Sequence, residues 1–165
     1  MFDAVFDSCV LIDYDFGGGI GVLAQHFAGR ANITRYVRDQ ELGKGLAKGK
    51  PDPCRHNGAL WIGTLDLDTD EHQLADELTL LLGKRHRGEA ESIAVCHFRG
   101  ATFCSRDADA IVQAAERGVA VISTSGILNA LVRTGALPHA AALTIIKAMV
   151  ARGIDEQLLI KPSEP

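Results

Sequence analysis

Apolar residues in this chain form short runs, separated by longer segments in which they recur at helical spacing. Residues 2–6 and 119–123 are runs typical of buried strands, and residues 59–67 alternate apolar with polar side chains. In residues 70–83 the apolar spacing is helical, with acids in the first turn and a glycine at the end. The predicted strands cover residues 2–6, 59–67, 101–105 and 119–123, and the predicted helices cover a short segment from Ser8 and residues 20–27, 34–47, 70–83, 88–98, 106–118, 124–135 and 137–153.

Short strands that alternate with helices indicate a parallel sheet covered by helices, because parallel neighbours need a crossover connection that is usually helical. We therefore predict an α/β fold, a three-layer α/β/α sandwich with a central parallel sheet. The 165 residues are enough for one domain with a substantial core, and they contain no internal repeat. A single domain over residues 1–165 is predicted.

The composition is that of an ordinary soluble globular protein, with 47% apolar and 23% charged residues. No apolar run reaches the roughly 18 residues of a membrane helix, and no signal-peptide pattern is present, so we expect a cytoplasmic protein without membrane contact. The net charge of −4 argues against a protein that coats nucleic acid indiscriminately. Basic residues still gather in residues 30–55 and 84–87, which is compatible with a local anionic ligand.

The four cysteines form no C-x-x-C pair, so neither a zinc ribbon nor a redox motif is indicated. Cys9, Cys96 and Cys104 lie in apolar stretches and are expected to be small core residues. Cys54 lies in a loop rich in polar residues, and we expect it to be exposed.

Carboxylates lie close to the ends of the predicted strands. Asp7 ends the first apolar run, although burying an ionised carboxylate without a partner is very costly. A later strand runs into Asp107 and Asp109, and the helix before that strand opens with Glu89 and Glu91. Helix capping explains each acid at the start of a helix when it is taken alone. Ligands of parallel sheets, however, bind beyond the carboxyl ends of the strands, and there these acids and Asp7 come together. Since Mg²⁺ and Mn²⁺ prefer oxygen ligands and would relieve the mutual repulsion, Asp7 is predicted to bind a metal.

Three segments of the sequence share their order and spacing with one known family. They are VFDSCVLID at residues 5–13, GEAESIAVC at residues 88–96 and ATFCSRDADAIVQAAERGVAVISTSGILNAL at residues 101–131, roughly a third of the chain. They resemble the opening strand, the GE-x-E helix and the strand-end Thr-x-Asp segment of the PIN-domain nucleases. Glu89 also precedes Ser105 by sixteen residues, as the family's helix acid usually precedes its strand-end Thr.

The resemblance implies that Asp7, Glu89 and Asp107 bind the metal as the first, third and fourth acids of the site. The family's second acid lies in Val-x-x-Glu-Leu, whereas this chain has YVRDQEL, with one extra residue after Val37. We select Glu41 as the second acid because Leu42 follows it, and Asp39 is the alternative. Further candidates are Ser105 in place of the usual Thr, Asp109 as a substitute for Asp107, and Glu91 as the neighbour of Glu89.

The activity that the resemblance implies is metal-dependent cleavage of RNA, with Mg²⁺ or Mn²⁺ as the cofactor. It also implies the toxin of a toxin–antitoxin pair, with an antitoxin protein as partner. Arg35, Arg38 and Lys44 would guide the RNA backbone past an acidic site that would otherwise repel it. The alternative is a non-catalytic PIN-like module that binds RNA or a protein, and measured magnesium affinity would separate the two.

Two helices in the C-terminal part offer surfaces for self-association. The helix at residues 137–153 carries Leu143, Ile146, Met149 and Val150 on one face. Packing of this face on the sheet is one interpretation, and a homodimer that uses this helix or residues 126–133 is the other. We predict the homodimer.

Overall fold

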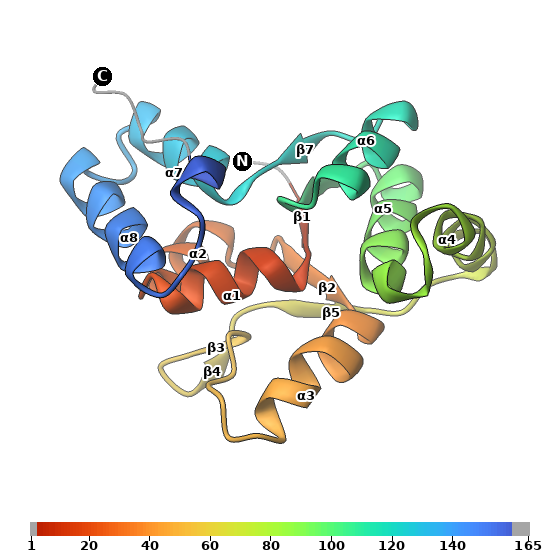
Figure 1. Ribbon diagram of the computed structural model, residues 1–165, viewed down its shortest axis with the longest axis horizontal. Helices are drawn as coiled ribbons and strands as arrows, with labels where there is room; N and C mark the ends of the chain where they lie inside the picture. Colours follow the sequence, from red (N-terminus) through yellow and green to blue (C-terminus); the bar gives the residue numbers. More distant parts are fainter. Residues whose placement is uncertain (1–2, 160–165) are drawn as a thin grey trace.

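The computed structural model describes residues 3–159, which form a central sheet with helices on both faces (Figure 1). Five parallel strands form this sheet in the order β5-β2-β1-β6-β7. They are β1 (Ala4–Phe6), β2 (Ala31–Thr34), β5 (Gly63–Leu65), β6 (Thr102–Cys104) and β7 (Val121–Ile122), and a separate antiparallel hairpin consists of β3 (Arg55–His56) and β4 (Ala59–Leu60).

Helices connect the strands and make up most of the described chain. The α-helices are α1 (Ser8–Phe16), α2 (Ile20–Phe27), α3 (Gly43–Leu46), α4 (Thr69–Leu82), α5 (Arg87–Arg99), α6 (Ala108–Glu116), α7 (Thr124–Arg133) and α8 (His139–Ala151). A π-helix, η1 (Val37–Leu42), precedes α3, and two 3₁₀ helices are η2 (Lys84–His86) and η3 (Glu156–Leu158). Within the described residues, none of these helices combines the length and apolarity needed to cross a membrane.

Side chains of the central strands alternate between the two faces of the sheet. Phe6 of β1 belongs to the apolar core beneath α1, α2, α7 and α8, whereas Val5 belongs to the core beside α4, α5 and α6. The two groups of helices lie on opposite sides of the sheet (Figure 1). This arrangement confirms the predicted three-layer α/β/α sandwich with a central parallel sheet.

The structure differs from the sequence prediction around the second strand. Residues 31–34 form β2, for which no strand was predicted, and Thr34 is its last residue. The Thr34 hydroxyl accepts a hydrogen bond from the Val37 amide at 3.3 Å, which helps to start the following helix. The strand predicted over residues 59–67 divides into β4 and β5, and only β5 joins the main sheet. Phe2, predicted as the start of the first strand, lies outside the described residues.

The glycine-rich turn between α1 and α2 lies beneath α8. A Cβ atom at Gly17 would lie 2.9 Å from side-chain atoms of Ile145 and Met149. At Gly19 it would lie 2.8 Å from the Tyr14 ring. Glycine at these positions therefore allows α8 to approach α1 closely, a packing role rather than a phosphate-binding one.

The apolar face of α8 on which the homodimer prediction rests is divided between the core and the surface. Ile146 and Met149 are buried, and the helix packs on α1 and α7. Leu143 and Val150 remain half-buried. The core therefore uses half of the face, and the homodimer stays a prediction.

Cys54 is a correction to the sequence analysis, because it is buried rather than exposed. The segment that carries it folds back on itself: the Trp61 amide donates to the Cys54 carbonyl at 3.2 Å, and the Trp61 ring nitrogen donates to the Pro53 carbonyl at 2.8 Å. Trp61 in turn packs edge-on against Phe6. A loop of polar sequence thus places its one cysteine in the core.

Candidate functional site

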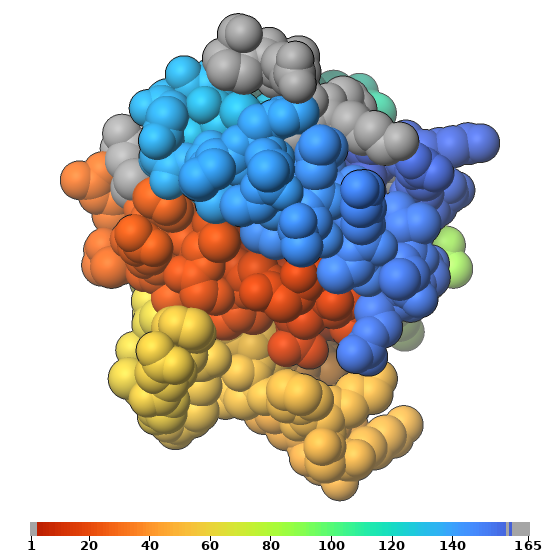
Figure 2. Space-filling model, turned by 90° about the vertical axis from the view of Figure 1, so that its left-hand side faces the viewer, coloured from red at the N-terminus to blue at the C-terminus, as the bar shows by residue number. Residues whose placement is uncertain are grey.

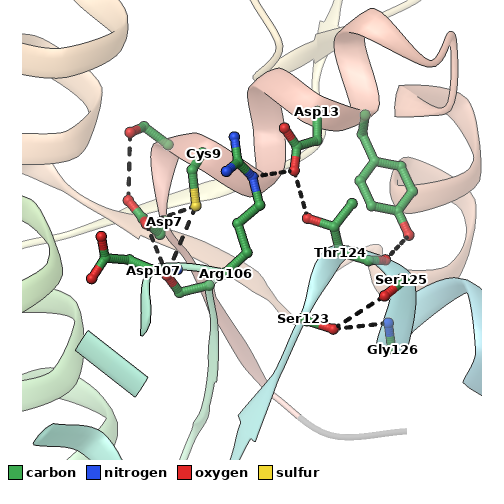
Figure 3. Close-up of polar contacts among 12 residues, drawn as sticks. Asp7, Cys9, Asp13, Arg106, Asp107, Ser123, Thr124, Ser125 and Gly126 are labelled. Atoms are coloured by element: carbon green, nitrogen blue, oxygen red, sulfur yellow. Dashed lines mark hydrogen bonds and ion pairs between the residues drawn. The ribbon is translucent and has the colours of Figure 1, made fainter. Parts of the chain in front are cut away.

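Asp7 lies at the carboxyl end of β1, next to Ser105 at the end of β6. The two strands are parallel neighbours with Phe6 opposite Cys104, and the Asp7 amide donates to the Cys104 carbonyl at 2.9 Å. The Ser105 hydroxyl donates to Asp7 Oδ2 at 3.0 Å, and the Cys9 thiol donates to the same oxygen at 2.9 Å (Figure 3). The sheet topology therefore places these side chains together, as predicted for Asp7 and Ser105.

The Asp7 carboxylate is 1% exposed, yet it does not act as a helix cap. Asp7 is the residue before α1, but its side chain accepts no capping hydrogen bond. Burial raises its pKa above the ordinary value, hydrogen bonds from Cys9, Ser105 and Ser8 oppose the rise, and the charge of Asp107 adds to it. The ionised form of Asp7 is therefore costly in the protein alone and would be stabilised by a bound cation.

Glu41 reaches the same site from η1. A Cβ atom built on Gly88 of α5 would lie 2.0 Å from Glu41 Oε1, so the carboxylate rests directly on the backbone at the start of α5. Burial, followed by the charges of Asp7 and Glu89, raises the pKa of Glu41 to about 7, although a hydrogen bond with Ser8 opposes this. The structure thus brings Glu41 together with the other predicted acids.

The π-helical geometry of η1 explains how Glu41 reaches this position. Residues 37–42 are π-helical, and the sequence has one more residue after Val37 than the Val-x-x-Glu-Leu pattern. A π-helix hydrogen-bonds i to i+5, so each of its turns holds more residues than an α-turn, and such turns are frequent at functional sites. Glu41 lies in this π-helical segment, with its carboxylate against Gly88 of α5.

Glu89 and Asp107 lie together with a residue that sequence reasoning missed, His86. One ligand atom from each of His86, Glu89 and Asp107 lies within 4.8 Å of the other two. His86 Nδ1 is 3.3 Å from Glu89 Oε1, while Glu89 Oε2 is buried without a hydrogen-bond partner among the described residues. Burial and the charge of Asp7 raise the pKa of Glu89. Asp107 also caps α6 by accepting from the Ala110 amide at 2.9 Å.

The remaining acidic candidates lie elsewhere or have other partners. Asp39 is exposed and its charge acts on Arg35, not on the other acids, so Glu41 is the acid that joins the site. Asp109 is exposed on the first turn of α6. Glu91 is buried in an ion pair with Arg87 at 2.9 Å, so its role is structural.

Of the three basic residues predicted to contact RNA, only Lys44 lies beside the carboxylates. Its charge acts on Glu41, and the two residues line the same pocket. Arg35 forms a two-pronged pair with Asp66, with distances of 2.5 and 2.8 Å. Arg38 is half-buried, and its charge acts on the Cys54 thiol.

The sequence analysis overlooked two polar contributors to this region. His86 is the last residue of η2, three positions before Glu89, a spacing that places two residues on one helix face. Cys9 was expected to be a core residue, but its thiol donates to Asp7, and burial with the charge of Asp7 raises its pKa. The i, i+3 spacing of His86 and Glu89 could have revealed the first of these, whereas nothing in an apolar run marks the second.

A second polar cluster lies beside the first on α1. Asp13 is 0% exposed, and its Oδ2 accepts from Arg106 Nε at 2.8 Å and from the Thr124 hydroxyl at 2.8 Å (Figure 3). The Arg106 charge also interacts with Asp7. Tyr14 donates to the Thr124 carbonyl at 3.2 Å, which ties α1 to the start of α7. This cluster fixes the loop between Ser105 and Asp107 relative to α1.

The buried acids of the described chain differ in whether they have an arginine partner. Four acidic side chains are buried, and Asp7 forms no ion pair with a described lysine or arginine. Each of the other three does: Arg106 lies 2.8 Å from Asp13, Arg99 lies 2.6 Å from Glu71 and Arg87 lies 2.9 Å from Glu91. Among the described residues, Asp7 is therefore the buried carboxylate that lacks an ion-pair partner, and it lies beside the half-buried Glu41, Glu89 and Asp107.

The side chains around Asp7 fit a hard divalent cation. Ligand atoms of His86, Glu89 and Asp107 lie within 4.8 Å of one another, and the charges of Asp7 and Glu41 act at the same place. The carboxylate oxygens are of the kind that Mg²⁺ and Mn²⁺ prefer as ligands. Glu89 Oε2 is buried without a protein partner within the described residues, which is unusual unless an ion or water completes it. His86 holds the other oxygen of Glu89 and so orients it.

Comparisons of the chain with protein-family models, with curated proteins and with solved structures returned no match.

Proposed function

We propose that this protein is a metal-dependent nuclease that hydrolyses RNA phosphodiesters at the site formed by Asp7, Glu41, Glu89 and Asp107. The observation that carries the proposal is the grouping of ligand atoms from His86, Glu89 and Asp107 beside the charges of Asp7 and Glu41, where Asp7 is a buried acid that forms no ion pair with a described arginine or lysine. The resemblance of the segments that bear Asp7, Glu89 and Asp107 to PIN-domain nucleases supports RNA as the substrate.

The chemistry requires water to add to the scissile phosphorus while one P–O ester bond breaks, giving a phosphate monoester and an alcohol. Mg²⁺ or Mn²⁺ held by Asp7, Glu89 and Asp107 would supply a Lewis acid and a water of lowered pKa. Hydrogen bonds from Ser105 and Cys9 hold Asp7 Oδ2 in place. Since these two hydrogen-bond donors fix the Asp7 carboxylate before the substrate binds, the carboxylate needs little reorganisation during the reaction.

Cleavage of a 5′-labelled, mixed-sequence single-stranded RNA tests this function. The full chain, freed of metal with EDTA, should cleave when Mg²⁺ or Mn²⁺ is restored and should be inactive in EDTA. The new ends should carry no 2′,3′-cyclic phosphate, because water rather than the 2′-hydroxyl is the nucleophile. Glu89→Gln, purified in parallel, should be inactive, which excludes a contaminating nuclease. RNA binding without cleavage in either metal would contradict the proposal and favour a non-catalytic module.

Gly88→Ala should reduce the metal affinity of the site with little effect on the stability of the fold. The new Cβ would lie 2.0 Å from Glu41 Oε1, so the Glu41 side chain must move. Alanine favours helix over glycine by about 1 kcal/mol, but the new Cβ would also lie 3.1 Å from Cγ2 of the buried Val37, so the two effects oppose each other and the melting temperature should change little. Displacing Glu41 from its place beside the metal ligands should weaken Mn²⁺ binding by about 10- to 100-fold, measured by isothermal titration.

A control for this variant is Gly43→Ala, also in a helix. A Cβ at Gly43 would approach nothing closer than 3.5 Å, so Mn²⁺ affinity should stay at the wild-type value. Equal Mn²⁺ affinity for Gly88→Ala and the wild-type protein would show that Glu41 is not part of the metal site.

A further inference from the structure

A pocket of about 230 Å³ adjoins the carboxylate site on one side. Its lining comes from α1, from η1 and α3, and from the loop that follows α3. Glu41 lines it and is also coupled electrostatically to Asp7 and Glu89, so the pocket opens directly beside the site. Figure 2 shows this face of the molecule, with α1 in red above the light-orange segment that contains α3.

Three lysines, Lys44, Lys48 and Lys50, line this pocket, and all three are exposed. None of them forms an ion pair within the described chain, although the charge of Lys44 acts on Glu41. By contrast, two arginines of the same part of the chain form ion pairs, Arg35 with Asp66 and Arg55 with Asp52. The positive charge around the pocket is therefore available to an anion from outside the protein.

The pocket wall opposite the lysines is apolar. Ile12, which is 39% exposed, and Phe16, which is half-buried, contribute to it from α1. The acidic Asp15 also lines the pocket, and Arg152 compensates part of its charge. An apolar wall facing free ammonium groups suits a ligand with a flat apolar part and a phosphate, as in a single-stranded nucleotide.

We propose that this lysine pocket binds one nucleotide of single-stranded RNA next to the scissile phosphate. The base lies on the wall formed by Ile12 and Phe16, and the backbone phosphates contact Lys48 and Lys50. This inference rests on the proposed nuclease function for the position of the scissile bond. Under this proposal Lys48 and Lys50, rather than Arg35 and Arg38, guide the RNA strand.

Binding of a fluorescein-labelled, unstructured 12-nucleotide RNA, followed by anisotropy, tests the pocket. Asp7→Asn serves as the background, in EDTA, so that neither cleavage nor metal contributes to binding. Adding Lys48→Gln and Lys50→Gln should weaken binding at least tenfold and reduce the slope of log K against log salt by about 1.4, as expected for two lost phosphate contacts. Ile12→Glu, which leaves the lysines intact, should also weaken binding by placing a carboxylate on the apolar wall.

The matched control is Arg133→Gln with Lys147→Gln, which removes the same charge from exposed positions on α7 and α8. It should leave both the affinity and the salt slope unchanged. No measurable RNA binding, an equal loss in the control, or an unchanged salt slope for the lysine variant would overturn the pocket. Normal cleavage by a Lys48→Gln/Lys50→Gln protein with intact Asp7 would overturn the pocket and leave the nuclease standing. Lysine-dependent RNA binding by a wild-type protein that cannot cleave RNA would support the pocket and contradict the nuclease function.

Discussion

Replacing Asp7 by asparagine is expected to abolish the proposed metal-dependent RNA cleavage while leaving the fold as stable as before or more so. The loss should be about 10³-fold or greater, equivalent to ~4 kcal/mol of activation free energy, because the substitution removes the most buried charge of the site. Burial raises the pKa of Asp7, so its ionised form opposes folding, and neutral asparagine of similar shape removes that cost. Single-turnover cleavage and thermal unfolding in EDTA measure the two effects.

Asp109→Asn is the matched control for this substitution. Asp109 is an exposed acid near Asp107, so its replacement should change neither the cleavage rate nor the melting temperature appreciably. A clear fall in melting temperature for Asp7→Asn would instead give Asp7 a structural role. Retained cleavage would remove Asp7 from the catalytic site.

Replacing Arg106 by alanine should cause the largest loss of stability, about 3–5 kcal/mol in the free energy of unfolding. Asp13 is fully buried, its Oδ1 already has no partner within the described residues, and its Oδ2 would retain only the Thr124 hydroxyl. A buried carboxylate would then remain without its compensating charge. Urea-induced unfolding, followed by circular dichroism, measures the change.

The double variant Arg106→Ala/Asp13→Asn distinguishes this cause from a general packing defect. It should recover most of the lost stability, because position 13 then carries no charge that needs compensation. Arg35→Ala offers a second comparison, since its pair with Asp66 is 59% and 68% exposed and should contribute less than about 1 kcal/mol. A loss of less than about 1 kcal/mol for Arg106→Ala would contradict the argument.

Local sequence patterns predicted α4 and α5 well, because periodicity and end signals agree there. The segment at residues 88–98 corresponds to α5, and residues 70–83 correspond to α4, whose first turn closes in a capping box between Asp68 and Glu71. Strand β2 could not be predicted in the same way. Its four residues, Ala-Asn-Ile-Thr, alternate apolar with polar side chains but are too few to distinguish a strand from a helical turn, and pairing with β1 and β5, a tertiary contact, decides its conformation.

The site was partly predictable, because strand-end residues of a parallel sheet must meet at one edge. The order of strands and helices therefore predicts Asp7 and Ser105 at one edge of the sheet, and in the structure the Ser105 hydroxyl lies 3.0 Å from Asp7 Oδ2. The choice between Glu41 and Asp39 depended instead on helix geometry, since a π-helix changes which residue faces α5. The contribution of Cys9 depended on the direction of one thiol, which an apolar sequence context does not encode.

The central position of β1 constrains when an active protein can form during synthesis. β1 pairs with β2 on one side and with β6 on the other, so the middle of the sheet stays incomplete until residue 104 is available. A nascent chain that has reached only the end of η1 carries Asp7 and Glu41 but lacks Glu89 and Asp107. Such non-local pairing slows folding, and we expect ribosome-bound fragments to have no nuclease activity until about two thirds of the chain has emerged.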